Sequence, residues 1–295
     1  MNSTSQTSLK IAVTGGSGSV GSALVRKLVS LGHDVTILDR IKPSPDIQAR
    51  FKWVDLLRRE TFGGLLEGLD AVAHLGEAPH ANAIRGPEAL FANNTAIGSG
   101  VMQAAADAGV KRFLYASTSQ VYGFWGTGKF PPDLVPTSWP MPEDQPVRPL
   151  NAYSLSKVAN EGYARYVSQT SEMTFAVVRF PAALELHSHW MRQMSSRIDQ
   201  RPNEGFYVQA NVLELADGFA RALTHDLPSK FNIYHFAAPD VLGDIPLRDR
   251  LKKFFPQLPD LPADWPDHAS PVSTERARRE LGWTHSSLRD AVSLL

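Results

Sequence analysis

Tyr153 and Lys157 are the residues whose types and spacing best suit acid–base chemistry. They stand four positions apart in the segment NAYSLSK, and residues i and i+4 share one face of a helix. A tyrosine with an ordinary pKa near ~10 is a poor acid–base catalyst at neutral pH, but a neighbouring ammonium favours its phenolate. Such a pair could take a proton from a substrate hydroxyl or return one to a carbonyl oxygen. Since YxxxK strings are common, the hypothesis depends on the residues around the pair.

A cluster of hydroxyl side chains stands upstream, in the segment FLYASTSQVYG at 113–123. It overlaps the end of a strand-like run, and ligands of open parallel sheets bind beyond the carboxyl ends of the strands. A hydroxyl there could hold the reacting oxygen of a substrate, and the candidates are Ser117, Thr118 and Ser119. The alternative is that these side chains only cap a helix or a turn, as Ser and Thr frequently do.

The segment TGGSGSVG at 14–21, called the glycine turn below, lies between an expected strand and an expected helix. Its GxxGxxG spacing is typical of a turn that lets the backbone approach the pyrophosphate of a dinucleotide, at a helix N-terminus that favours negative charge. The strand–turn–helix context favours this interpretation over an ordinary tight turn. The residues expected to contact the dinucleotide here are Gly15, Gly18, Ser19, Val20 and Gly21.

Asp39 ends the second strand-like run, 18 residues after Gly21. A carboxylate at this position would accept hydrogen bonds from the adenosine ribose and repel a 2′-phosphate, so NAD is expected rather than NADP. Arg40 follows it, and its guanidinium could instead pair with that phosphate. Asp55, after the third strand-like run, could contact the adenine or be an ordinary surface acid.

The composition narrows the classes of function. The chain has 295 residues and a formal net charge of +0, from 30 basic and 30 acidic residues. Without a basic block, nucleic-acid binding is not expected, and the absence of cysteine excludes disulfides and Cys-ligated zinc. No metal site is expected, because His187 and His189 are followed by no third ligand at a recognisable spacing. The polar N-terminus and the lack of a long apolar run predict a cytoplasmic protein with a small-molecule substrate and no membrane partner.

The elements that must position these residues alternate between short apolar strands and helix-period segments. Strands are expected at 10–14, 34–39, 71–75, 112–116, 174–180 and 231–237, and helices at 20–31, at 88–108, from 151 onward and at 212–225. This alternation predicts βαβ units and an α/β fold, a doubly wound parallel sheet of the Rossmann-like kind with helices on both faces. A long loop is expected at 130–149, which holds seven prolines.

The expected domain organisation follows from these elements. Residues 1–8 are expected to be a disordered tail, and 9–180 the NAD(P)-binding domain, with sheet elements returning at 211–238. Beyond the sheet the pattern loosens and prolines become frequent. A small, mostly C-terminal substrate-binding lobe is therefore expected from 181–210 and 239–295.

Together these segments resemble the extended short-chain dehydrogenase/reductase family, also called the NAD-dependent epimerase/dehydratase family. The matching motifs cover most of the chain in family order: TGGSGSVG, Asp39, Asp55-Leu56, AHLG at 73–76, Asn94, YASTSQVYG, YSLSK and ARRELGW at 277–283. The resemblance implies that Thr118 is the catalytic hydroxyl, with Ser117 as the alternative one position earlier. It implies that Tyr153 is the acid–base residue and that Lys157 binds the ribose and lowers the pKa of that tyrosine. The further cofactor contacts that it implies are Leu56, Leu75, Gly76 and Asn94, and a homodimer is implied by analogy alone.

Two departures from the family pattern bear on the substrate. Ala182 stands where the family usually has an asparagine that helps to hold the diphosphate of a nucleotide sugar, which weakens the case for such a substrate. Glu77 stands where a small residue is usual, and the sequence offers no account of it. The AHLG tetrapeptide itself is similar to that of uronate dehydrogenases within the family.

The leading hypothesis is therefore an NAD-dependent oxidoreductase that transfers hydride between the nicotinamide and a small carbohydrate or related hydroxyl or carbonyl compound. One alternative is a nucleotide-sugar epimerase, which would use the same site and reoxidise its cofactor within each turnover. Another is a regulator that senses the dinucleotide without chemistry. The candidate substrate contacts are Ser117, Ser119, His187, Trp190 and Arg192.

Overall fold

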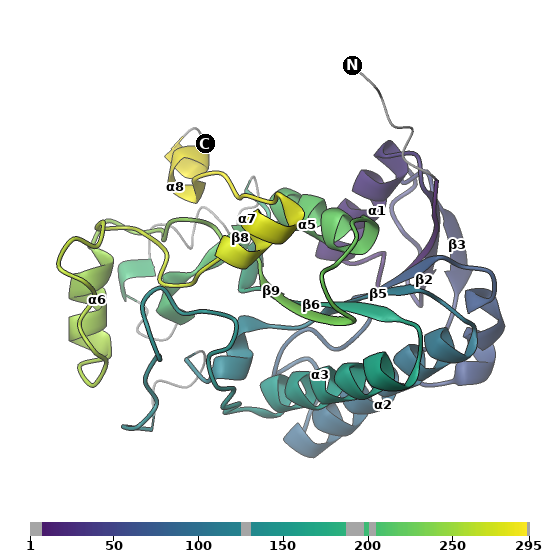
Figure 1. The fold of residues 1–295 in the computed structure, drawn as a ribbon, viewed down its shortest axis with the longest axis horizontal. Helices are drawn as coiled ribbons and strands as arrows, with labels where there is room; N and C mark the ends of the chain where they lie inside the picture. The colour runs from purple at the N-terminus through teal and green to yellow at the C-terminus, as the bar shows by residue number, and fades with distance from the viewer. Residues whose placement is uncertain (1–7, 125–130, 187–197, 201–204, 294–295) are drawn as a thin grey trace.

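Seven parallel strands form the central sheet of this protein, in the order β3-β2-β1-β4-β5-β6-β9 (Figure 1). The structure, a computed structural model, describes residues 8–124, 131–186, 198–200 and 205–293. The strands are β1 Lys10–Thr14, β2 Asp34–Asp39, β3 Arg50–Trp53, β4 Ala71–His74, β5 Arg112–Ala116, β6 Thr174–Arg179 and β9 Phe231–His235. The expected doubly wound parallel sheet is confirmed.

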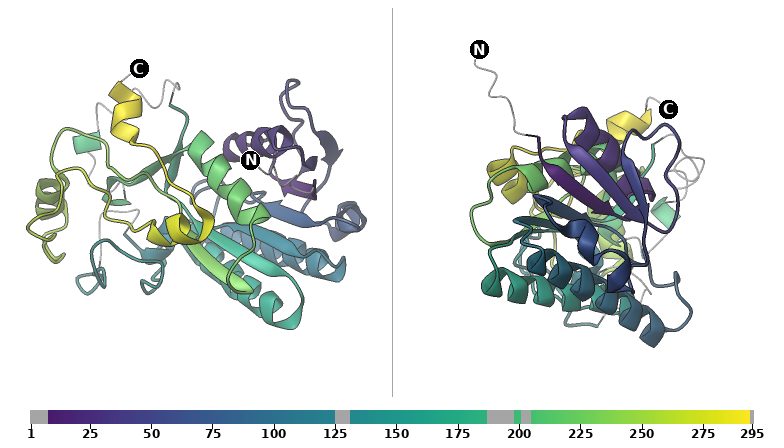
Figure 2. Two further views of the ribbon diagram at one scale, coloured as in Figure 1. Left: turned by 45° about the horizontal axis from the view of Figure 1, so that its top comes forward. Right: turned by 90° about the vertical axis from the view of Figure 1, so that its right-hand side faces the viewer.

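Helices cover both faces of this sheet (Figure 2). On one face α1 (Ser19–Ser30) packs against α5 (Val212–Thr224), which also contacts α7 (Glu275–Leu281). On the other face α2 (Pro87–Asp107) packs along α3 (Ala152–Thr170). Because both faces are covered, central strands such as β4 are buried at every position, which explains why their sequences lack polar alternation.

The strand order reverses between β1 and β4. From β1 the chain moves outward to β2 and β3, then returns to β4 and moves outward the other way through β5, β6 and β9. In doubly wound sheets a crevice opens at this reversal, outside the carboxyl ends of the strands. The segments that follow β1, β2, β4 and β5 meet at this edge, which brings the glycine turn, Asp39, residues 75–79 and residues 117–119 together.

A second apolar cluster lies apart from the two layers that sandwich the sheet. It gathers side chains from the described parts of 121–141 and 184–208 and from the C-terminal part of the chain. Its elements include β7 (Ala182–Leu184), α6 (Leu247–Phe254) and α8 (Leu288–Ser293), and β7 pairs with β8 (Gln209–Asn211). The strands β7 and β8 escape prediction because three residues are too few to show a periodicity. The described part of the proline-rich loop, 131–149, contains neither helix nor strand beyond one bridge between Met141 and Val272.

Of the expected N-terminal tail, only Ser8 belongs to the described residues, and its hydroxyl donates a hydrogen bond of 2.7 Å to the carbonyl of Gly32. Within the described ranges, every helix is too short or too polar to cross a membrane.

Candidate active site

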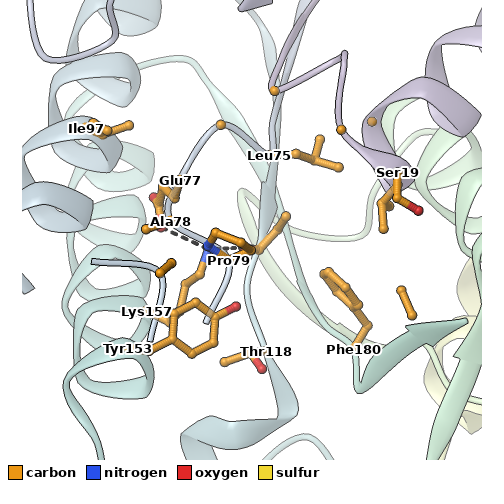
Figure 3. A pocket seen from close by; sticks show the side chains of 18 of the residues that line it. Ser19, Leu75, Glu77, Ala78, Pro79, Ile97, Thr118, Tyr153, Lys157 and Phe180 are labelled. Atoms are coloured by element: carbon orange, nitrogen blue, oxygen red, sulfur yellow. Dashed lines mark hydrogen bonds and ion pairs between the residues drawn. The ribbon is translucent and has the colours of Figure 1, made fainter. Parts of the chain in front are cut away.

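A cavity of about 940 Å³ opens at the carboxyl edge of the sheet, where the strand order reverses. Its volume is at the upper end of the ~300–1,000 Å³ that small-molecule sites span, so a ligand as large as a dinucleotide has room. Figure 3 shows part of the lining from close by. The sequence-predicted residues that line it are Gly15, Gly18, Ser19, Val20, Gly21, Asp39, Arg40, Asp55, Leu56, Leu75, Gly76, Thr118, Ser119, Tyr153 and Lys157.

The glycine turn brings α1 tightly against β1 and β4. Gly15 has a φ of +69°, and an added Cβ would lie 2.7 Å from the carbonyl carbon and oxygen of Leu75. At Gly21 a Cβ would lie only 2.1 Å from the carbonyl oxygen of Gly15. Gly18 is the N-cap of α1 and provides no side-chain cap, so the first N–H groups of the helix stay available to a ligand. This geometry fits a bound pyrophosphate.

Asp39 is held rigidly at the end of β2. One oxygen of its carboxylate accepts a hydrogen bond of 3.1 Å from the backbone N–H of Ser17, and the other accepts one of 3.1 Å from that of Ile41. The carboxylate thereby ties the glycine turn to β2 and presents a fixed negative charge to the cavity. Arg40 lines the cavity beside it.

Two of the residues expected at the cofactor or the substrate lie behind the cavity wall. Asn94 is fully buried in α2, and its side-chain amide bonds both the N–H and the carbonyl of Ala78, at 3.0 and 3.1 Å. It therefore holds the loop after β4 in place. Ser117 is also buried and donates a hydrogen bond of 2.5 Å to Glu161. Thr118, one position later, does line the cavity, and so does Ser119.

Tyr153 and Lys157 occupy the first turns of α3. Asn151 is the N-cap of this helix. Its side chain accepts a hydrogen bond from the N–H of Ser154 in a reciprocal capping box, and the i,i+4 relation holds. The Lys157 ammonium lies 5.6 Å from the centre of the Tyr153 ring and donates a hydrogen bond of 2.7 Å to the carbonyl of Ala116. In Figure 3 the phenol of Tyr153, the ammonium of Lys157 and the side chain of Thr118 lie near one another at the cavity.

The electrostatics around Tyr153 differ from the expectation of a lowered pKa. Burial raises the pKa of Tyr153, the charge of Lys157 lowers it, and the carboxylate of Glu77 raises it again, so that the result lies above the ordinary value. The expected lowering of this pKa followed from Lys157 alone, whereas burial and Glu77 act in the opposite direction. Burial lowers the pKa of Lys157, but Glu77 and Tyr153 raise it to above its ordinary value, so the lysine stays charged.

A second buried network joins α3 to the end of β6. The guanidinium of Arg179, at the end of β6, makes two hydrogen bonds to the carboxylate of Glu161 on α3, at 2.6 and 3.0 Å. It also donates to the hydroxyl of Tyr122 at 2.7 Å, and that hydroxyl contacts His235. The sequence places Arg179 in an expected buried strand but does not show that Glu161 is its partner, because only the fold pairs them across β6 and α3.

The wall of the cavity formed by 180–183 and Val208 is mostly apolar. It includes Phe180, Pro181 and Ala182, with Gln209 paired opposite Ala182 in the β7–β8 ladder. The side-chain oxygen of Gln209 is buried without a hydrogen-bond partner among the described residues. Three of the expected substrate contacts, His187, Trp190 and Arg192, lie outside the described residues. Within the same ranges, no three or more His, Asp or Glu side chains are grouped as they would be around a metal ion.

Comparison with known proteins identifies the family. Residues 11–201 match the model of the NAD dependent epimerase/dehydratase family. The chain belongs to this family. The resemblance to extended short-chain dehydrogenases/reductases is thereby confirmed. The glycine turn, Asp39 and the tyrosine–lysine pair all lie within the matched residues.

The similarity to individual proteins is moderate. The chain is 27% identical over 179 residues to the UDP-glucose 4-epimerase of Lactobacillus helveticus, a match that spans 58% of this chain and only 51% of that protein. It is 24% identical to the UDP-glucose 4-epimerase of Lacticaseibacillus casei over 93% of this chain and 91% of that protein. A crystal structure of a short-chain dehydrogenase/reductase superfamily protein from Agrobacterium tumefaciens with bound NAD has the same fold. Its TM-score is 0.72 at 22% identity, over 97% of this chain and 95% of that one.

Proposed function

We propose that this protein is an NAD-dependent oxidoreductase that transfers hydride between the nicotinamide and a small carbohydrate, or a related hydroxyl or carbonyl compound. The observation that carries the proposal is that the glycine turn, Asp39 and the Thr118, Tyr153 and Lys157 side chains line one cavity. The close approach at Gly15 and Gly21 and the uncapped start of α1 suit a dinucleotide. When bound, this group supplies the hydride donor or acceptor.

The roles of the protein side chains follow from their positions. Tyr153 would give its proton to a carbonyl oxygen in the reductive direction and take a proton from a hydroxyl in the oxidative one. Lys157 stays protonated beside the phenol and stabilises the phenolate that forms when the proton leaves. The hydroxyl of Thr118 would orient the same substrate oxygen.

NAD is proposed over NADP because of Asp39. Both oxygens of its carboxylate accept hydrogen bonds from backbone N–H groups, which favours keeping the negative charge at the end of β2, where a 2′-phosphate would lie. Bringing two negative charges together in a partly enclosed cavity is unfavourable. Arg40 beside it is the feature that opposes this preference.

A nucleotide-sugar epimerase is the second candidate, because two of the similar proteins are UDP-glucose 4-epimerases. The full-length similarity to an epimerase from Lacticaseibacillus casei supports it. Ala182 stands where the family usually has an asparagine that helps to hold the diphosphate of a nucleotide sugar, and the side chains of 180–183 and Val208 around it are apolar. Both features favour a substrate without a diphosphate. We therefore place the small carbohydrate first.

The deciding measurement is the nucleotide content of the purified protein, obtained by denaturing it and analysing what is released. A protein that is largely empty, binds added NAD reversibly and forms NADH with a sugar or uronate from a broad panel supports the oxidoreductase. Near-stoichiometric NAD that survives purification, with a nucleotide sugar converted and no net NADH, supports the epimerase. Binding of NAD without turnover of any substrate would instead favour the sensing role.

The acid–base role is tested by Tyr153→Phe, with Tyr166→Phe as the matched control. Tyr166 lies on the same helix but is 52% exposed, so its hydroxyl should not matter. We expect Tyr153→Phe to lower turnover by roughly 10²- to 10⁴-fold while NAD still binds. Near-normal turnover of Tyr153→Phe would refute the mechanism.

A further inference from the structure

Glu77 is a buried carboxylate at the cavity with four polar partners on three elements. Its side chain is 2% exposed. One oxygen accepts from the ammonium of Lys157 at 2.9 Å and from the hydroxyl of Tyr115 at 3.2 Å. The other lies 2.9 Å from the amide nitrogen of Asn160 and 3.2 Å from the ring nitrogen Nε2 of His74. Figure 3 shows Glu77 beside Lys157, joined by a dashed line.

The surrounding fold leaves space for this carboxylate. At Gly98 of α2 an added Cβ would lie 2.1 Å from the amide nitrogen of Asn160 and 2.7 Å from an oxygen of Glu77. His74 is itself fixed by a hydrogen bond of 2.6 Å to the hydroxyl of Thr14 at the end of β1. The network therefore connects α3, α2, β4, β5 and β1, and Glu77 is at its centre.

Glu77 is ionised in this setting. Burial raises its pKa, but the charge of Lys157 and the hydrogen bond with His74 lower it, and the net shift is downward. A buried carboxylate without such partners would take up a proton. Lys157 and Glu77 thus form a buried ion pair, and two of the three N–H groups of the lysine are committed to Glu77 and to the carbonyl of Ala116.

We propose that Glu77 is a positioning residue for the proton transfer. Its carboxylate anchors the ammonium of Lys157 and offsets most of the positive charge of that lysine. Tyr153 therefore stays a phenol until a second positive charge binds in the cavity. This inference rests on the proposed function, because it takes Tyr153 as the acid–base residue. It gives Glu77 a role that acts through Lys157.

The sign of the effect follows from the titratable groups that face the pair. Around Glu77 these are Lys157 on α3, His74 on β4 and Tyr115 on β5, and Glu161 acts on Lys157 from the next turn of α3. Glu77 raises the pKa of Tyr153, whereas Lys157 lowers it. Removing only the negative charge of Glu77 should therefore make the phenolate form at lower pH, because the phenolate then becomes the anion that keeps Lys157 protonated.

The test is a titration of Tyr153 followed by the ultraviolet absorbance of its phenolate, without and with NAD. The other tyrosines are subtracted by titrating the same protein with Tyr153→Phe. In Glu77→Gln, which keeps the shape of the side chain, the midpoint of Tyr153 should fall by about one pH unit or more. Glu172→Gln is the control, because this exposed glutamate lies just beyond the far end of α3. An unchanged or higher midpoint in Glu77→Gln overturns the proposal.

A double variant keeps the proposal testable if Glu77→Gln alone does not fold. Replacing both members of a buried ion pair is usually tolerated far better than replacing one. With Glu77→Gln and Lys157→Met together, Tyr153 should titrate close to its wild-type midpoint, because the two charges offset each other. A midpoint well above that of the wild type would mean that Lys157 acts with its full charge, which overturns the proposal. These titrations decide the role of Glu77 even if the protein binds no NAD. A failure to bind NAD would count against the proposed function and not against the role of Glu77.

Discussion

Replacing Gly21 by alanine should damage both the stability of the protein and its affinity for NAD. An alanine Cβ at this position would lie 2.1 Å from the carbonyl oxygen of Gly15 and 2.9 Å from the Cα of Gly16. All of these are backbone atoms of the glycine turn, so no side chain can move aside. The N-terminus of α1 must instead shift away from β1 by roughly 1 Å, and it carries the N–H groups expected to bind the pyrophosphate.

The size of the effect can be stated from general packing energetics. Overpacking costs ~1–3 kcal/mol, and a backbone-to-backbone overlap belongs at the upper end of that range. For a chain of this size each kcal/mol corresponds to roughly 2–4 °C in Tm, so we expect a decrease of about 6–12 °C. The affinity for NAD should fall at least ~10-fold, which is a loss of about 1.4 kcal/mol.

Thermal melting with and without NAD, together with calorimetric titration of NAD, measures both effects. Gly162→Ala is the matched control, since Gly162 lies in α3 and an added Cβ there meets nothing within 4 Å. That variant should be as stable as the wild type or more stable by up to ~1 kcal/mol, because alanine favours helix. If Gly21→Ala melted within ~2 °C of the wild type and bound NAD equally well, the assignment of the glycine turn would be refuted.

Three further predictions follow from individual contacts. Arg179→Met should lower the free energy of unfolding, measured in urea, by about 3–5 kcal/mol, because it leaves the buried Glu161 without its bidentate partner. Adding Glu161→Gln should restore much of this loss. If the double variant recovers no stability, the pairing is contradicted. Burial and the charge of Arg179 lower the pKa of His235 from 6.5 to about 3, so below pH 6.5 the unfolded chain takes up a proton on this histidine before the folded chain does. The free energy of unfolding should therefore be at its full value above pH 6.5 and fall by up to ~1.4 kcal/mol per pH unit below it. In His235→Gln this slope should be shallower. Asp39→Ala should weaken NAD binding and strengthen NADP binding in calorimetric titrations, and an unchanged ratio of the two affinities would contradict the ribose-binding role.

Much of the fold was predictable because parallel sheets bury their strands on both faces. The apolar runs at β1, β4, β5 and β6 were visible in the sequence, and so were the helices between them. The short strands β7 and β8 left no such pattern, since a pairing of three residues depends on its partner. Asn94 and Ser117 were placed at the cavity from their positions in the motifs. In the folded protein their side chains instead make hydrogen bonds behind the wall of the cavity.

The sequence by itself determined the residue types and the local geometry at the candidate site. The order of the motifs placed the glycine turn after β1 and a carboxylate at the end of β2, and the i,i+4 relation of Tyr153 and Lys157 depends only on their helix. Tertiary structure alone decided the electrostatics, because the strength of a charge depends on burial and on partners distant in sequence. Glu77 stands 80 positions before Lys157 in the sequence, and the pairing of β4 with β5 and the packing of α2 on α3 bring them within 2.9 Å. The chain therefore specified the tyrosine–lysine pair locally, whereas the pKa of its tyrosine was fixed only by the assembled fold.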